Sequence, residues 1–354
     1  MNDQTCPVDQ EIIDICSLFF DGTPASAKLI DTSREEEDFR NTFIIETGDG
    51  NRVVLKITAN EFTFPEKIHM WARTVDEYRA LGYYCPRILC DKNGGFPVIR
   101  YKDRDCVVYA EEFSKYGSFE ERRSGDADAQ NADTGRYLRD IWTMTAKIAA
   151  KRLDYTEYPS VWCLYDTFEP SDEMDEVMEN ALEWKKTAEA LPGEFSEQVR
   201  RIWNRWSENR EALEGLYRKL PTSVFQADLN STNLLVDEDG NFKGVCDFNL
   251  SGKEVFLNYL MRENFDDFEK EIDLIREVLR IASEYYSFNE DEKKAALPLY
   301  RCLKPLWYMR VCDLQEAGND PEKIRKCLDQ VEHYQTADID FAGCMEFVGE
   351  SVLG

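Results

Sequence analysis

Three oxygen-bearing side chains surround two short apolar runs in the second half of the chain. Asn233 follows Asp228 by five residues and Asp247 follows it by 19, around apolar runs at 234–236 and 244–245 joined by a tight turn. This set suits phosphoryl transfer. Asp228 could orient an acceptor hydroxyl and take its proton, and Asn233 and Asp247 could hold magnesium between nucleotide phosphates.

A lone lysine lies within a second apolar run, Val-Val-Leu-Lys-Ile at 53–57. Burying Lys56 is costly unless it has anionic partners, so we expect it to hold nucleotide phosphates and to pair with a carboxylate of the following helix. Glu66 and Glu77 both lie on that helix, on one face. The alternative is an edge-strand lysine that faces water.

Composition limits the function classes. The 354 residues suffice for two lobes, and no apolar run is long enough to cross a membrane. A net charge of −27 makes nucleic acid and anionic membranes poor partners; the acidic surface either attracts a cationic substrate or only keeps the protein in solution. The 11 cysteines form no C-x-x-C pair, which favours reduced, mostly buried thiols in a cytoplasmic protein. With only two histidines, zinc and Ser-His-Asp chemistry are disfavoured.

The elements that must position these residues change in character along the chain. The first part has strand-type runs at 26–30, 41–47, 52–57, 96–101 and 105–110, with a helix over 65–81 that begins at a proline and ends at a glycine. Helical periodicity then covers 134–152, 172–190, 194–219, 271–286, 292–317 and 321–334. Pro298 and Pro305 are expected to break or kink the helix at 292–317.

The motifs at 226–233 (Gln-Ala-Asp-Leu-Asn-Ser-Thr-Asn) and 244–248 (Gly-Val-Cys-Asp-Phe) resemble those of the aminoglycoside phosphotransferase and choline kinase family of small-molecule kinases. The resemblance covers roughly residues 20–335. It implies an α+β, bilobal, protein-kinase-like fold, with a small antiparallel-sheet lobe carrying one helix at 1–113 and a larger, mainly helical lobe at 114–354. It also implies ATP or GTP, Mg²⁺ and a small-molecule hydroxyl acceptor.

The resemblance assigns roles residue by residue. Asp228 matches the catalytic base, and Asn233 and Asp247 match the metal ligands. The family's helix carboxylate aligns one turn from Glu77, which makes Glu77 the preferred partner of Lys56. The segment at 109–113 looks like the one that joins the lobes, so the backbone of Glu111, Glu112 and Phe113 would pair with the base of the nucleotide.

Three features depart from the family pattern, and one of them is Asn249, which stands in place of glycine after Asp247-Phe248. Gln226 stands where the family usually has histidine, although glutamine can still bond to the backbone and shape the loop. The segment at 32–40 has no glycine and carries four acids that would repel a triphosphate. These departures keep open an alternative function, a catalytically weak or inactive kinase-fold protein that binds a ligand or regulates a partner.

Overall fold

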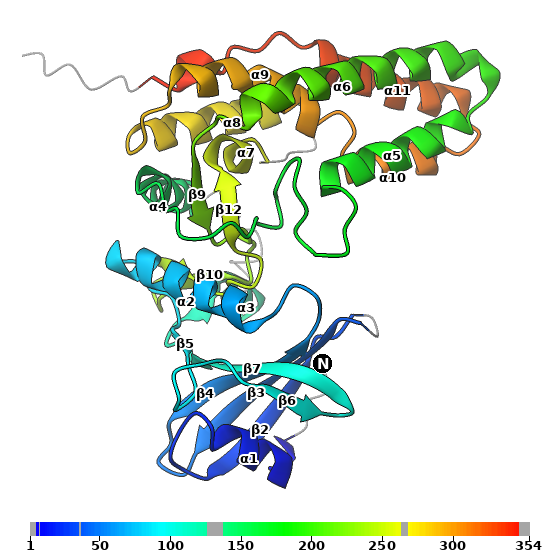
Figure 1. Cartoon of the computed structure of the whole chain (residues 1–354). Helices are drawn as coiled ribbons and strands as arrows, with labels where there is room; N and C mark the ends of the chain where they lie inside the picture. Colours follow the sequence, from blue (N-terminus) through cyan, green and yellow to red (C-terminus); the bar gives the residue numbers. More distant parts are fainter. Residues whose placement is uncertain (1–4, 7, 35–36, 126–136, 263–267, 347–354) are drawn as a thin grey trace, which may run out of the picture. The chain divides into compact units, whose positions relative to one another are not determined.

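The computed structural model describes residues 5–6, 8–34, 37–125, 137–262 and 268–346. The chain forms two compact units, which we describe one at a time (Figure 1). The sheet unit comprises Met1–Tyr137, Glu169–Ser171 and Gln226–Gly252. The helical unit comprises Leu138–Phe168, Asp172–Phe225 and Lys253–Gly354. The hairpin with the three polar side chains therefore belongs to the same unit as Lys56, whereas the predicted lobes divide the chain once, between 113 and 114.

An antiparallel sheet of seven strands, counted over the described residues, forms most of the sheet unit. Its order is β1-β2-β3-β4-β7-β5, and β6 pairs with β7 beside β5. The strands are β1 (Thr5–Cys6), β2 (Pro24–Asp31), β3 (Phe39–Thr47), β4 (Arg52–Ala59), β5 (Ile88–Leu89), β6 (Val98–Tyr101) and β7 (Arg104–Glu112). The five predicted strands are confirmed, and β4 is central rather than an edge.

Alternating burial gives the sheet two distinct faces. On one face, Leu55 and Ile57 of β4 and Val108 of β7 form a core with α1 (Gln10–Cys16). Because successive side chains of a strand point to opposite faces, Lys56 projects to the other side. There Trp71 of α2 (Pro65–Ala80) packs against Tyr109, with ring centroids 6.1 Å apart. Helix α1 is an element that the sequence analysis missed.

A second, three-stranded sheet of the same unit contains the predicted hairpin. Its order is β11-β10-β8, with β8 (Gly117–Ser118), β10 (Leu234–Val236) and β11 (Phe242–Val245), and α3 (Phe119–Gly125) follows β8. The hairpin prediction is therefore confirmed.

The helical unit includes a two-stranded sheet of β9 (Thr222–Phe225) and β12 (Gly252–Val255). Its helices are α4 (Leu138–Ala150), α5 (Glu176–Glu189), α6 (Ser196–Tyr217), α7 (Phe256–Met261), α8 (Phe268–Ser283), α9 (Glu290–Leu303), α10 (Tyr308–Ala317) and α11 (Pro321–Thr336). Short 3₁₀ turns lie at Gly193–Phe195 and Ala342–Cys344. The predicted break at Pro305 is confirmed, whereas Pro298 lies inside α9. Residues 134–136 of the predicted helix 134–152 lie outside the described residues.

None of the helices in the described ranges is long and apolar enough to cross a membrane. Ten of the cysteines in these ranges, all except Cys6 of β1, are described as free thiols. Most of them are buried, as predicted.

Candidate active site

The register of the β10–β11 hairpin brings Asn233 and Asp247 to one end of it. Leu234 pairs with Val245, and the Cys246 amide donates to the Asn233 carbonyl at 3.0 Å. Asn233 therefore precedes the first strand where Asp247 follows the second. Asp247 has a positive φ of 56°, a backbone conformation that non-glycine residues seldom adopt.

Gly244 lets the segment after α2 approach the hairpin closely. The Tyr84 amide donates to the Lys243 carbonyl at 2.7 Å, and the Val245 amide donates to the Tyr84 carbonyl at 3.1 Å. A Cβ atom on Gly244 would lie 1.9 Å from the Tyr84 oxygen, so only glycine fits. The hairpin is thereby fixed to the end of α2.

Gln226 joins the two loops that carry the acidic side chains. Its Nε2 donates to the carbonyls of Asp228, Cys246 and Asp247 at 3.0, 2.8 and 2.8 Å. Its Oε1 accepts from the Asp228 amide at 2.7 Å. The side chain is fully buried, so it satisfies backbone groups that would otherwise be left unpaired. Glutamine here shapes the loop as the sequence analysis expected.

The Asp228 carboxylate is fixed by two amides. Its Oδ1 accepts from Asn230 Nδ2 at 2.7 Å, and its Oδ2 accepts from Asn233 Nδ2 at 2.9 Å. Burial and the negative charge of Asp247 raise the pKa of Asp228, and the bonds from the two amides oppose this shift. A half-buried carboxylate held in this way can accept a proton at a fixed position.

Lys56 lies between two carboxylates. Its Nζ is 3.0 Å from Glu111 Oε1 and 3.3 Å from Asp247 Oδ1. Burial alone would lower the pKa of Lys56, but attraction to Asp247 and Glu111 outweighs burial and raises this pKa well above its usual value. The ammonium is therefore charged, and the alternative of a lysine that faces water on an edge strand is wrong.

The residues at the end of the hairpin fit a magnesium ion. The Asn233 amide nitrogen is taken by Asp228, so Oδ1 is the atom that could face a cation. This oxygen accepts one bond of 3.3 Å from the Thr232 hydroxyl, and Asn233 is only 6% exposed. An amide oxygen and the Asp247 carboxylate are hard donors of the kind that Mg²⁺ prefers. No cluster of three or more His, Cys, Asp or Glu suited to a metal occurs in the described ranges, so phosphate oxygens and water would complete the coordination.

Comparison with known proteins identifies the family of the chain. Residues 33–255 match the model of the phosphotransferase enzyme family, designated APH. The chain belongs to this family. The expected resemblance to aminoglycoside phosphotransferases is thereby confirmed, and the protein is a phosphotransferase. A search of curated proteins found no match.

Solved structures show the same α+β fold as this phosphotransferase. A microcompartment-associated aminopropanol kinase has a TM-score of 0.54 and 15% sequence identity, with 92% of this chain and 95% of that chain covered. Amicoumacin kinase in complex with AMP-PNP and Ca²⁺ has a TM-score of 0.51 and 12% identity, with 95% and 97% covered. The predicted fold class, with an antiparallel-sheet part followed by a mainly helical part, is confirmed.

The other three predicted nucleotide-binding residues lie on α2 and at the end of β7. Glu77 is a half-buried residue of α2. The Glu112 carboxylate pairs with Arg79 and Arg87 at 3.6 and 3.5 Å, and its amide donates to the Arg87 carbonyl. The Arg52 guanidinium covers the ring of Phe113 at 3.8 Å. Their roles in binding nucleotide stay predictions.

The acidic segment at 32–40 is partly neutralised by its own arginines. Asp38 accepts two bonds of 2.6 Å from Arg40 and one of 3.0 Å from Asn60. The positive charge of Arg34 acts on Asp228 and lowers its pKa. Glu35 and Glu36 lie outside the described residues. The repulsion expected from four acids is therefore reduced by at least the Asp38–Arg40 pair.

Tyr78 of α2 is a contributor that the sequence analysis missed. The Gln226 amide donates to its hydroxyl at 3.2 Å, and its ring packs edge-on against Phe248, with centroids 5.5 Å apart. The tyrosine falls on the apolar face of a predicted helix, so the sequence shows only that it is buried.

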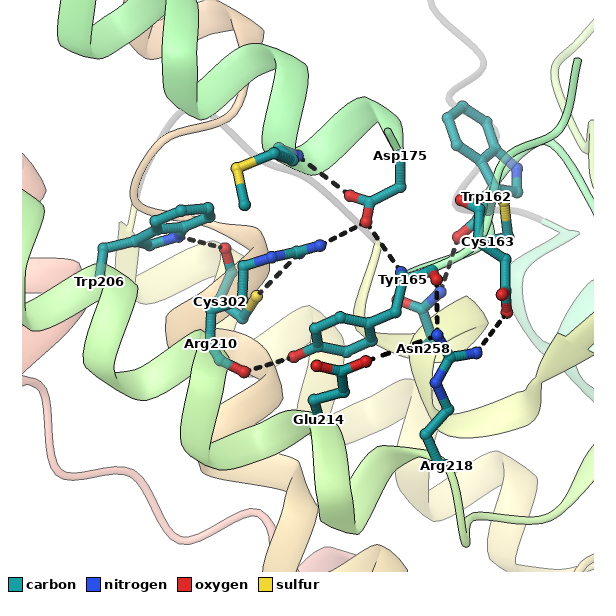
Figure 2. Close-up of polar contacts among 12 residues, drawn as sticks. Trp162, Cys163, Tyr165, Asp175, Trp206, Arg210, Glu214, Arg218, Asn258 and Cys302 are labelled. Carbon is teal, nitrogen blue, oxygen red and sulfur yellow. Dashed lines mark hydrogen bonds and ion pairs between the residues drawn. The ribbon is translucent and has the colours of Figure 1, made fainter. Parts of the chain in front are cut away.

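A separate polar cluster lies within the helical unit (Figure 2). Asp175 caps α5 by accepting from the Met178 amide at 3.0 Å, and it also accepts from the Tyr165 amide and pairs with Arg210. The Tyr165 hydroxyl donates to the Arg210 carbonyl at 2.7 Å. Asp175 belongs to an acidic run that is easily taken for a solvated helix face, yet it is buried.

Proposed function

We propose that this phosphotransferase transfers the γ-phosphoryl group of ATP or GTP to a hydroxyl group of a small molecule, with Mg²⁺ and in the cytoplasm. The observation that carries the proposal is the cluster of Asp228, Asn233, Asp247 and Lys56 in one compact unit. Phosphoryl transfer needs positioning and charge neutralisation more than covalent chemistry, and this cluster offers both.

Each residue has one role in the proposed step. The acceptor hydroxyl oxygen attacks the γ-phosphorus, the bond from that phosphorus to the bridging oxygen breaks, and the nucleoside diphosphate leaves. Asp228 takes the hydroxyl proton. Lys56 binds phosphate oxygens, and Asn233 and Asp247 would hold Mg²⁺, which neutralises phosphate charge when bound. The raised pKa of Asp228 favours proton acceptance, because a stronger base accepts the proton more readily.

The relatives of known structure support a nucleotide and a small acceptor. Both compared structures with a TM-score above 0.5 are named as kinases of small molecules, and one contains AMP-PNP with a divalent cation. The free thiols of the described cysteines agree with a reducing compartment.

A cationic acceptor is the finer part of the proposal. The helical unit has a pocket of about 420 Å³ with aromatic walls from Tyr165, Trp203 and Trp206. Glu173 and Glu211 line it, and so does Arg210, whose charge is balanced by Asp175. Aromatic faces and carboxylates together suit an ammonium group. This pocket, with the acidic run at 169–179 and the net charge of −27, favours an amino sugar or amino alcohol.

A nucleotide-consumption screen tests the proposal. Purified protein is given Mg²⁺ and ATP or GTP with amino sugars, amino alcohols, amino acids and neutral sugars, and Asp228→Asn is run beside it. We expect turnover with at least one amine-bearing alcohol and none with the variant. Turnover of neutral alcohols alone would reject the cationic acceptor. Metal-dependent nucleotide binding without turnover of any acceptor would favour the inactive binding protein.

A further inference from the structure

The side chain of Glu111 lies beside Lys56 because of the register of two neighbouring strands. Lys56 of β4 stands opposite Tyr109 of β7, and Glu111 is two residues further along β7. Residues two apart on a strand share a face, and a diagonal cross-strand neighbour is within reach of a long side chain. Glu111 therefore reaches the ammonium group from the sheet itself, at 3.0 Å.

The two carboxylates that share Lys56 differ in how firmly they are held. Glu111 pairs with Val54 of β4 on one side and with Ile88 of β5 on the other, and its side chain is 14% exposed. Asp247 follows the hairpin in a loop, and its side chain is 37% exposed. A charge that is enclosed is more costly to leave unpaired than one that water reaches, so the bond to Glu111 is the more permanent of the two.

We propose that Glu111 is the positioning residue that keeps Lys56 aimed at the phosphates when Asp247 engages a divalent cation, an inference that rests on the proposed function. The lysine side chain is long and flexible, and its ammonium carries three donors. One donor directed to Glu111 holds the stem in place, and the others stay available for phosphate oxygens. The carboxylate of β7 thus pairs with the lysine for which the family resemblance had implied a carboxylate of α2.

The first test measures the Lys56 amine directly and needs no catalysis. The rate of Lys56 acetylation by acetic anhydride is followed by peptide mass spectrometry, with the exposed Lys92 as internal reference. The variants are Glu111→Gln, Glu77→Gln, which removes the partner expected from the resemblance, and the matched control Glu46→Gln at an exposed position of β3. Removing the negative charge favours the free amine, and one unit of pKa changes its amount about tenfold. We expect labelling to speed up about fivefold or more in Glu111→Gln and to stay within about twofold in Glu77→Gln and in the control Glu46→Gln.

The second test is AMP-PNP affinity by calorimetry with Mg²⁺. We expect binding to weaken about tenfold in Glu111→Gln and little in the control Glu46→Gln. Glu111→Asp keeps the negative charge but has a shorter side chain. Its labelling rate and its AMP-PNP affinity should lie between those of wild type and Glu111→Gln. This variant replaces Glu111→Gln in both tests if Glu111→Gln does not fold.

The outcomes separate the two proposals. If wild-type protein and Glu111→Gln bind nucleotide equally well, the positioning role is overturned and the proposed function is not. The same holds if Glu77→Gln, and not Glu111→Gln, speeds the labelling of Lys56. Wild-type protein that binds no nucleotide overturns the proposed function, and the positioning role with it.

Discussion

In the helical unit, Asp175 and Arg210 are 1% and 8% exposed, and their partners are fixed by neighbouring helices and loops. In the sheet unit, Lys56, Glu111 and Asp247 are 17%, 14% and 37% exposed, and one ammonium serves two carboxylates. The first cluster is closed, because each carboxylate oxygen of Asp175 accepts at least one bond from within the unit. The second is open, with an excess of acceptors that a cation could use.

This difference indicates opposite uses of charge. A buried pair whose partners are all internal specifies how α5 and the preceding loop pack, and breaking it leaves an uncompensated charge. A partly exposed group with spare lone pairs can exchange its partner for a ligand. We therefore expect substitutions in the open cluster to change activity more than stability, and substitutions in the closed cluster to do the reverse.

The largest expected effect is that of Asp228→Asn. The variant keeps the size of the side chain but cannot accept the hydroxyl proton, so kcat should fall by about 10²- to 10⁴-fold. The melting temperature should stay close to that of wild type. Initial rates and thermal melts measure the two quantities. Asp239→Asn, an exposed position in the turn of the same hairpin, is the control and should keep full activity.

Next in size is Arg210→Met in the closed cluster. Removing the guanidinium leaves the Asp175 charge buried, which should lower the free energy of unfolding by about 3–5 kcal/mol. Arg200→Met, an exposed position on the same helix, should cost less than about 1 kcal/mol. Urea unfolding followed by circular dichroism gives both values. A Lys56→Met variant as unstable as Arg210→Met would contradict the distinction between the clusters.

The sequence predicted features that depend on neighbours close in the chain. The hairpin follows from two apolar runs around a turn, and the spacing of Asp228, Asn233 and Asp247 follows from that hairpin. An apolar run predicted β4, and the lone lysine within this run showed that Lys56 needed a partner. Pro305 ends a helix because it cannot continue the backbone bonding.

What the sequence could not supply depends on register and packing between distant segments. The pairing of β4 with β7 decides that Glu111 meets Lys56, and nothing near either residue records that register. Pro298 lies inside α9 because the helix is held by buried neighbours such as Leu299 and Tyr300. Asp175 looks like one more acid in an acidic run until Arg210 is brought against it from α6.

A smaller effect, on both stability and activity, is expected for Gln226→Leu. Leucine fills the space but removes a donor shared by three carbonyls and an acceptor for the Asp228 amide. We expect a loss of about 1–3 kcal/mol in stability and a fall in kcat, since the loop around Asp228 loosens. Gln226→His supplies one donor and one acceptor on an imidazole ring, so it should retain more stability and more activity than Gln226→Leu. Equal loss in the two variants would show that shape, not hydrogen bonding, is what the position needs.

The smallest expected effect is a pH shift in Asn230→Ala. Asp228 acts as a base only when ionised, so the rate is lost as the pH falls through the pKa of Asp228. Asn230 donates to this carboxylate and lowers its pKa, so removing the amide should raise the pKa and move the acid limb of kcat/KM to higher pH. The profile is compared with that of Asn241→Ala, whose amide bonds to Asp237 instead. An acid limb that stays in place, or moves to lower pH, would mean that the limb reports another group, and Asp228 would lose its assignment as the base.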